Sequence, residues 1–205
     1  MLKIFLARHG QNVDNLNGVL NGHRDLPLTD KGVEQAQELA RRINESALVF
    51  DKIYCSPLIR AKRTAEIVAE ELGMPKPTVL DSLIERDFGV MSGQPINKIE
   101  ELCGPNILKT DTITYFLDAE GCESFDDAVE RGKQVLEYIK KHHHDGNILL
   151  VGHGDMGKMI FAAYFGIPWR EVLTLFHFGN SELIELSEET NVNNFHKVKI
   201  NQFNH

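Results

Sequence analysis

The sequence predicts an α/β fold, a three-layer α/β/α sandwich with a mostly parallel sheet and helices on both faces. Short apolar runs of strand length alternate along the 205 residues with longer segments of helical period. No internal repeat, low-complexity tract or linker rich in Pro, Gly or Ser interrupts this alternation. We therefore expect residues 1–205 to form a single domain.

Five apolar runs have the length and composition of strands, and we predict strands at 3–7, 52–55, 78–80, 147–151 and 182–186. Helices are expected between them, at about 29–44, 56–72 and 124–142, with another after residue 154. Thr29 and Ser124 are suitable N-caps, because a hydroxyl can accept a hydrogen bond from a free N–H of the first turn. Ser56 followed by Pro57 predicts an N-cap and a first helical residue for the second helix.

The least regular part of the chain is 94–121, which contains Pro95, Gly104, Pro105 and a cluster of threonines. We predict an excursion over the edge of the sheet here. Irregular segments carried by a rigid scaffold commonly shape binding sites, so this one is expected to form part of a substrate pocket.

The charge balance excludes some classes of partner. Twenty-two Lys and Arg against 30 Asp and Glu give a net charge of −8, without a long basic run. We therefore expect no nucleic-acid and no membrane partner, and any anionic ligand must be held by a local pocket. Cys55, Cys103 and Cys122 form no CxxC pair, and no apolar stretch has the length of a signal peptide or a membrane span, which favours a cytoplasmic protein.

Two predicted strands end in a similar way. The first leads into Arg8-His9-Gly10 and the fourth into Gly152-His153-Gly154. Ligands of open α/β sheets bind outside the carboxyl ends of the strands, so His9 and His153 are expected to face one crevice, where the glycines allow close approach. The alternative is that each histidine only hydrogen-bonds a neighbour.

A third strand end contributes Arg60, in the first turn of the helix that follows. A cation is unfavourable at the positive end of a helix, and a bound anion would remove this penalty. The forked donors of arginine match phosphoryl oxygens, so Arg60 is a candidate phosphate clamp. The alternative is an ion pair with a nearby carboxylate.

Four motifs occur in order between residue 3 and about residue 160: Arg8-His9-Gly10 with Asn15 further on, the segment 56–65, Glu85-Arg86-Asp87-Phe88-Gly89, and Gly152-His153-Gly154. Together they resemble the histidine phosphatase superfamily, which includes the cofactor-dependent phosphoglycerate mutases. The loop 21–29 and the segment 121–124, with one extra residue, are also similar to family elements. Asn12 departs from the pattern, because Thr or Ser is usual there.

The resemblance implies a role for each matching residue. His9 is expected to be the nucleophile that accepts the phosphoryl group, with Glu85 as general acid, and charge on the phosphoryl oxygens would be stabilised by Arg8, Arg60, His153 and Asn15. Substrate contacts are also expected from Asn21, Gly22 and Gly154. No metal and no cofactor are implied. For the acid, two alternatives stay open: Glu85 could pair with Arg86, and Asp87 could take its place.

The function we expect is hydrolysis of a small phosphomonoester, with a small phosphorylated metabolite as partner and a homodimer left open. A phosphoglycerate mutase is the alternative, supported by Glu85-Arg86 and Asn97-Lys98. Against it, Gln11 follows the His-Gly pair, and 94–121 contains only Lys98 and Lys109 where mutases carry adjacent arginines. A non-enzymatic phosphate-binding member is a third possibility.

Residues 152–157 also fit the GxGxxG pattern of dinucleotide-binding folds. That pattern belongs to the first strand and helix of such a fold, and too few residues follow Gly157 to complete one. A glycine turn that binds phosphate explains the same residues.

Overall fold

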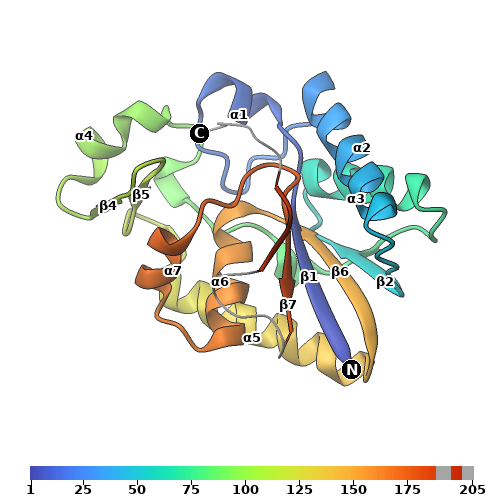
Figure 1. The fold of residues 1–205 in the computed structure, drawn as a ribbon. Helices are drawn as coiled ribbons and strands as arrows, with labels where there is room; N and C mark the ends of the chain where they lie inside the picture. Colours follow the sequence, from blue (N-terminus) through green and yellow to red (C-terminus); the bar gives the residue numbers. More distant parts are fainter. Residues whose placement is uncertain (188–194, 200–205) are drawn as a thin grey trace.

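The computed structural model describes residues 1–187 and 195–199. Within them, a six-stranded sheet has the order β3-β2-β6-β1-β7-β8 (Figure 1). Its strands are β1 (Leu2–Arg8), β2 (Lys52–Cys55), β3 (Thr78–Val79), β6 (Gly146–Gly152), β7 (Leu183–Leu186) and β8 (His196–Val198). The first four are parallel, whereas β7 and β8 run antiparallel to their neighbours. The sheet is therefore mostly parallel, as predicted.

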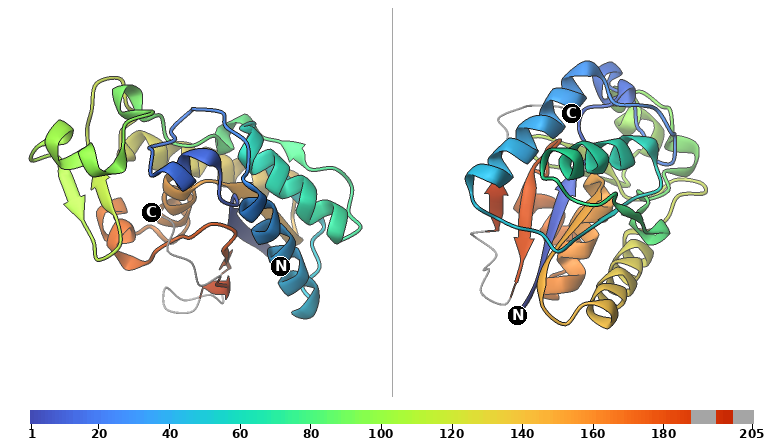
Figure 2. Two further views of the ribbon diagram at one scale, coloured as in Figure 1. Left: turned by 90° about the horizontal axis from the view of Figure 1, so that it is seen from above. Right: turned by 90° about the vertical axis from the view of Figure 1, so that its right-hand side faces the viewer.

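Helices cover both faces of this sheet (Figure 2). One face packs against α2 (Asp30–Glu45) and α3 (Ile59–Glu71), and the other against α5 (Phe125–His142), α6 (Gly154–Phe165) and α7 (Trp169–Leu175). Successive side chains of a strand point to opposite faces, so Phe5 and Ala7 join the α2–α3 core while Ile4 and Leu6 join the α5–α6 core. The predicted three-layer α/β/α sandwich is confirmed.

The register of the central strands determines where the site forms. In the parallel β1–β6 pair, Arg8 lies opposite Gly152, and the His9 N–H donates to the Gly152 carbonyl at 3.0 Å. In the β2–β6 pair, Cys55 lies opposite Val151. The residues that follow these three strands therefore emerge side by side at the carboxyl edge of the sheet.

Two of the three predicted helix caps are present. The Gly32 N–H donates to Thr29 Oγ1 at 3.1 Å, and the Asp127 N–H donates to Ser124 Oγ at 3.0 Å. The predicted strand 78–80 ends one residue earlier, and the strand 182–186 begins one residue later, as β3 and β7.

The predicted cap at Ser56 is wrong. Helix α3 begins at Ile59, whose N–H donates to Asp25 Oδ1 at 2.7 Å, so the loop before α2 caps this helix from a distance. Ser56 Oγ instead accepts the Leu58 N–H and hydrogen-bonds His153. Pro57 consequently lies before the helix rather than in its first turn.

Several elements were not predicted. Helix α1 (Val13–Asn17) follows β1, and the short 3-10 helices are η1 (Asp81–Leu83), η2 (Gly89–Met91) and η3 (Ile96–Lys98). Residues 94–121, which we call the hairpin segment, contain η3, α4 (Ile99–Cys103) and an antiparallel hairpin of β4 (Ile107–Lys109) and β5 (Thr114–Phe116). This hairpin is separate from the main sheet, and Phe116 and Ile99 of the segment form a small core together with Phe88 and Met91. Among the described helices, none has the length and apolar character needed to cross a membrane.

Candidate active site

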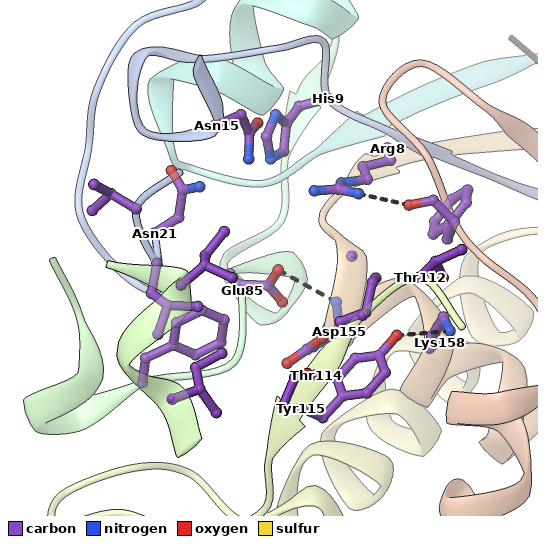
Figure 3. A pocket seen from close by; sticks show the side chains of 18 residues that line it. Arg8, His9, Asn15, Asn21, Glu85, Thr112, Thr114, Tyr115, Asp155 and Lys158 are labelled. Atoms are coloured by element: carbon purple, nitrogen blue, oxygen red, sulfur yellow. Dashed lines mark hydrogen bonds between the residues drawn. The ribbon is translucent and has the colours of Figure 1, made fainter. Parts of the chain in front are cut away.

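A cavity of ≈ 250 Å³ lies between the carboxyl edge of the parallel strands and the hairpin segment (Figure 3). Six predicted site residues line it: Arg8, His9, Asn15, Asn21, Glu85 and Gly154. Arg60 and His153 are completely buried directly behind His9. Gly22 does not line the cavity; its carbonyl accepts a hydrogen bond from Arg60 Nη2 at 2.9 Å. The predicted contact of Gly22 with substrate is therefore replaced by a supporting contact to Arg60.

The His9 ring is held in one tautomer. Its Nδ1 lies 2.7 Å from the Gly10 carbonyl, which can only accept, so Nδ1 carries the proton and Nε2 is unprotonated. Arg60 Nε donates to this Nε2 at 3.2 Å. Burial, followed by the charges of Arg60 and Arg8, holds the pKa of His9 well below its usual range. His9 is thus a neutral imidazole with its nucleophilic nitrogen beside a guanidinium.

His153 comes from the neighbouring strand end, and its ring centroid lies 5.2 Å from that of His9. Its Nε2 is 2.7 Å from Ser56 Oγ. Within residues 1–187 and 195–199 its buried Nδ1 has no hydrogen-bond partner. Burial first, then the Arg60 charge, also lowers the pKa of His153 well below its usual range. An unpartnered buried polar atom is costly, so this ring is suited to a ligand that supplies the missing partner.

Arg60 is a fully buried cation and Arg8 a half-buried one, and neither has a carboxylate partner in the described part of the chain. Arg60 donates to the carbonyls of Arg24 (2.6 Å) and Gly22, and Arg8 Nη1 donates to the Phe178 carbonyl at 2.7 Å. The Arg8 Nε is buried and unpartnered among these residues. Burial lowers the pKa of Arg8 and lowers that of Arg60 to about 10. Buried uncompensated guanidinium groups are unfavourable unless an anion joins them.

Glu85 lies on the opposite side of the cavity from His9 (Figure 3). Its Oε1 accepts hydrogen bonds from the N–H groups of Arg86 and Met156, each at 2.9 Å, whereas Oε2 has only a 3.4 Å contact with the Asp155 N–H. Burial and the Asp155 charge raise the pKa of Glu85, against the opposing effect of those backbone bonds. Oε2 is therefore the oxygen that can carry a proton.

The two alternatives for the acid are not supported by the geometry. The Arg86 guanidinium pairs with Asp155 at 2.9 Å, whereas Glu85 accepts a hydrogen bond from the backbone N–H of Arg86. Asp87 is about half exposed, pairs with His23 at 3.6 Å, and does not line the cavity. Of Glu85 and Asp87, only Glu85 thus lines the cavity; Asp155 also lines it but is paired with Arg86.

The remaining predicted residues complete the wall near His9. Asn15 Oδ1 accepts from the Asn12 N–H and from Asn180 Nδ2, both at 3.3 Å, which orients the amide group of Asn15. Gly154 lies beside the Arg8 guanidinium, which is 3.6 Å from the position of a Cβ at Gly154. Asn12, the departure from the family pattern, caps α1 by accepting the Asn15 N–H at 3.0 Å, as a Ser or Thr would.

Several supporting residues were missed by the sequence analysis. Thr64 Oγ1 accepts the Gly10 N–H at 3.0 Å and donates to the Arg60 carbonyl at 2.8 Å, and Asn180 Nδ2 donates to the His9 carbonyl at 2.8 Å. Thr64 lies one helical turn after Arg60, a spacing that could have indicated it. Asn180 lies in a turn before β7, and no local pattern marks it.

The fold and this geometry define an α/β protein that can hold a phosphate-like anion against a neutral histidine. The family model for the histidine phosphatase superfamily (branch 1) matches residues 4–201, and the chain belongs to this family. It is 34% identical over 168 residues to a 2,3-bisphosphoglycerate-dependent phosphoglycerate mutase of Methylobacterium sp. (strain 4-46), covering 80% of this chain and 81% of that relative.

Other relatives are phosphatases. Identity is 28% over 178 residues with the adenosylcobalamin/alpha-ribazole phosphatase of Escherichia coli (strain K12), covering 82% of this chain and 81% of that protein. A phosphoserine phosphatase mutant from Entamoeba histolytica, solved in complex with phosphoserine, has a TM-score of 0.70 and 28% identity over 90% of each chain. The family thus supports a histidine phosphatase-type enzyme and includes both phosphatases and mutases.

Proposed function

We propose that this protein hydrolyses a small phosphomonoester through a phosphohistidine at His9. The observation that carries the proposal is the pair of guanidinium groups of Arg8 and Arg60, the first half-buried and the second fully buried. Neither has a carboxylate partner among the described residues, and both lie beside a neutral imidazole whose Nε2 is unprotonated. A phosphoryl group placed there would supply the missing counter-charge and meet the nucleophile.

In the first step, His9 Nε2 attacks phosphorus, the P–N bond forms and the ester P–O bond breaks. The electron pair goes to the leaving oxygen, which takes a proton from Glu85 Oε2. In the second step, the Glu85 carboxylate accepts a proton from water, the water oxygen bonds to phosphorus and the P–N bond breaks. The products are the free alcohol and inorganic phosphate, with His9 and Glu85 restored.

Charge stabilisation in both steps comes from the protein's own side chains. Arg8 Nε and His153 Nδ1 lie close to His9 and are among the buried polar atoms without a hydrogen-bond partner in 1–187 and 195–199, and Arg60 already lies against His9 Nε2. Phosphoryl transfer depends mainly on alignment and on neutralising the equatorial oxygens. We therefore propose a reaction that requires neither a metal ion nor a cofactor.

The relatives named as mutases support one second candidate, bisphosphoglycerate-dependent phosphoglycerate mutase. A mutase must hold a second acidic group, and the lysines of the hairpin segment are not placed to do so. Lys98 pairs with Glu101 and Lys109 with Glu100; all four side chains are exposed and none lines the cavity. This favours hydrolysis of a small phosphorylated metabolite, which we assign to the cytoplasm because free thiols fit a reducing compartment.

The test is a phosphomonoester panel assayed after treatment with a chelator, beside 3-phosphoglycerate with and without 2,3-bisphosphoglycerate. Phosphate release supports hydrolysis, whereas isomer formation that depends on the bisphosphate identifies a mutase. His9→Ala should lose both turnover and ³²P labelling of the protein. His144→Ala, an exposed histidine far from the cavity, is the matched control and should retain both. Turnover or labelling by His9→Ala would refute the assignment of the nucleophile.

A further inference from the structure

Resting on the proposed hydrolysis, we propose that the substrate is a phosphate monoester of an uncharged, largely apolar alcohol or phenol. The part of the cavity beyond His9 and Arg8 forms a second subsite, made by the loop after α1, by Phe88 and by the hairpin segment. The apolar residues of this subsite are Val19, Leu20, Phe88, Ile96, Ile99 and Ile113. An apolar wall binds the organic group by removing apolar surface from water.

The cavity is large enough for such a group. A water molecule needs about 10–15 Å³ of comparable volume. A cavity of ≈ 250 Å³ therefore has room for roughly 17–25 non-hydrogen atoms, enough for a phosphoryl group and an organic group of at least about ten non-hydrogen atoms. This corresponds to an aryl or medium-length alkyl group rather than a long chain or a polymer.

The charged groups beyond the phosphate site disfavour a second anion on the substrate. Lys158 is the additional cation of the wall, but its Nζ already donates to the Tyr115 hydroxyl at 3.0 Å, to the Leu173 carbonyl at 3.1 Å and to the Phe176 carbonyl. All three of its N–H donors are used, so none remains for a ligand.

The acidic groups of the wall also disfavour a second anion on the substrate. Asp155 and Glu85 both line the cavity, and Asp155 already pairs with Arg86. A substrate carboxylate in this subsite would be desolvated beside these groups without a free cation to pair with. Phosphorylated carboxylic acids and bisphosphates are therefore poor substrates.

A few polar groups remain for weak orientation of the substrate. Thr112 and Thr114 line the cavity from the hairpin segment and place hydroxyl groups on its wall (Figure 3). Hydroxyl groups can accommodate an ether or hydroxyl of the substrate, but they do not compensate a charge. They also offer a position at which the chemistry of the wall can be changed, because Thr112 is only partly buried.

The experiment compares kcat/KM for 3-phosphoglycerate and for its methyl ester, which differ in the carboxylate charge and leave through the same type of alkoxide. 3-Phenylpropyl phosphate is the apolar member of the set. We expect the methyl ester to be preferred over the acid about tenfold or more, and the phenylpropyl ester to be preferred further. Thr112→Arg should reverse the preference between acid and methyl ester, because it adds a cation to the subsite.

Leu102→Arg is the matched control, since Leu102 lies on the same segment but is 50% exposed and outside the cavity. Leu102→Arg should still prefer the methyl ester over the acid, as the wild type does. Hydrolysis of the acid at least as fast as its methyl ester would overturn this inference and leave the proposed phosphatase intact. Absence of phosphate release from every ester would refute the proposed function itself.

Discussion

Lys158 makes the stability of this protein depend on pH in a way that can be calculated from the structure. The side chain is 2% exposed, and its three hydrogen-bond partners are the Tyr115 hydroxyl and the carbonyls of Leu173 and Phe176. Burial lowers the pKa of Lys158 from its usual 10.5 to about 7, with Asp155 opposing this effect and Arg8 adding to it.

The sign of the effect follows from proton uptake. Between pH 7 and about 10, an unfolded chain holds a proton on Lys158 that the folded protein has lost, so the free energy of unfolding rises with pH by about 1.4 kcal/mol per pH unit. Below pH 7 both states are protonated and the full destabilisation, about 4–5 kcal/mol, is present. The network stays satisfied in both forms, because the Tyr115 hydroxyl can donate to a neutral amine.

Urea denaturation at pH 7.5 and pH 9.5 tests this reasoning with wild type, Lys158→Met and Lys62→Met. The free energy of unfolding of wild type minus that of Lys158→Met should increase by about 2–3 kcal/mol between the two pH values. Lys62 is exposed on α3, so the same difference taken with Lys62→Met should stay constant. A Lys158→Met difference that does not change with pH would show that Lys158 titrates as an ordinary lysine and would refute the argument.

Three further variants test the site. Glu85→Gln should slow the first step, transfer of the phosphoryl group to His9, about 10²–10⁴-fold for an alkyl phosphate but change the pre-steady-state burst of nitrophenolate from nitrophenyl phosphate little, because nitrophenolate leaves without a proton. It should also remove the decline of the alkyl phosphate rate as pH rises through the raised pKa of Glu85, and equal losses in the first step for both esters would contradict an acid role. Arg60→Ala should reduce kcat/KM by a factor that corresponds to about 2–4 kcal/mol of lost transition-state stabilisation, whereas Arg63→Ala, at an exposed position, should leave kcat/KM unchanged. Similar kcat/KM values for the two variants would argue against Arg60 as a phosphate clamp. Gly10→Ala should destabilise the fold by about 1–3 kcal/mol or more, because its Cβ would lie 2.2 Å from the Gly32 carbonyl oxygen; thermal unfolding at the wild-type temperature would exclude this clash.

The core of the fold could be predicted because its signals are local. β1 and β6 are buried on both faces and appear in the sequence as continuous apolar runs. Thr29 and Ser124 cap helices through a hydrogen bond to a residue three positions later. Once both strands are assigned to one parallel sheet, their carboxyl ends meet, which is why His9 and His153 could be placed together before any coordinates were known.

The parts that escaped prediction depend on contacts between distant residues. Ser56 has the sequence context of an N-cap, but His153, 97 residues away, uses its hydroxyl, and Asp25 caps the helix instead. Asn180 supports the His9 carbonyl across 171 residues, and no periodicity encodes such a contact. The hairpin segment contains elements of three to five residues, too short for a periodic pattern to appear.

The parts of the site that could be predicted are those proposed to act on phosphorus, and the parts that could not be predicted are those that face the organic group of the substrate. His9 and His153 directly follow the apolar strands β1 and β6, and Arg60 lies in the first turn of the helix after β2, so sheet register largely sets the positions of these groups. The wall that faces the organic group of the substrate comes largely from the hairpin segment. The strands of this segment contribute to a separate small core and do not pair with the main sheet. We therefore expect substitutions at partly buried wall positions such as Thr112 to change what is bound while the groups at phosphorus stay in place. A fold built in this way accounts for one family that contains both mutases and phosphatases.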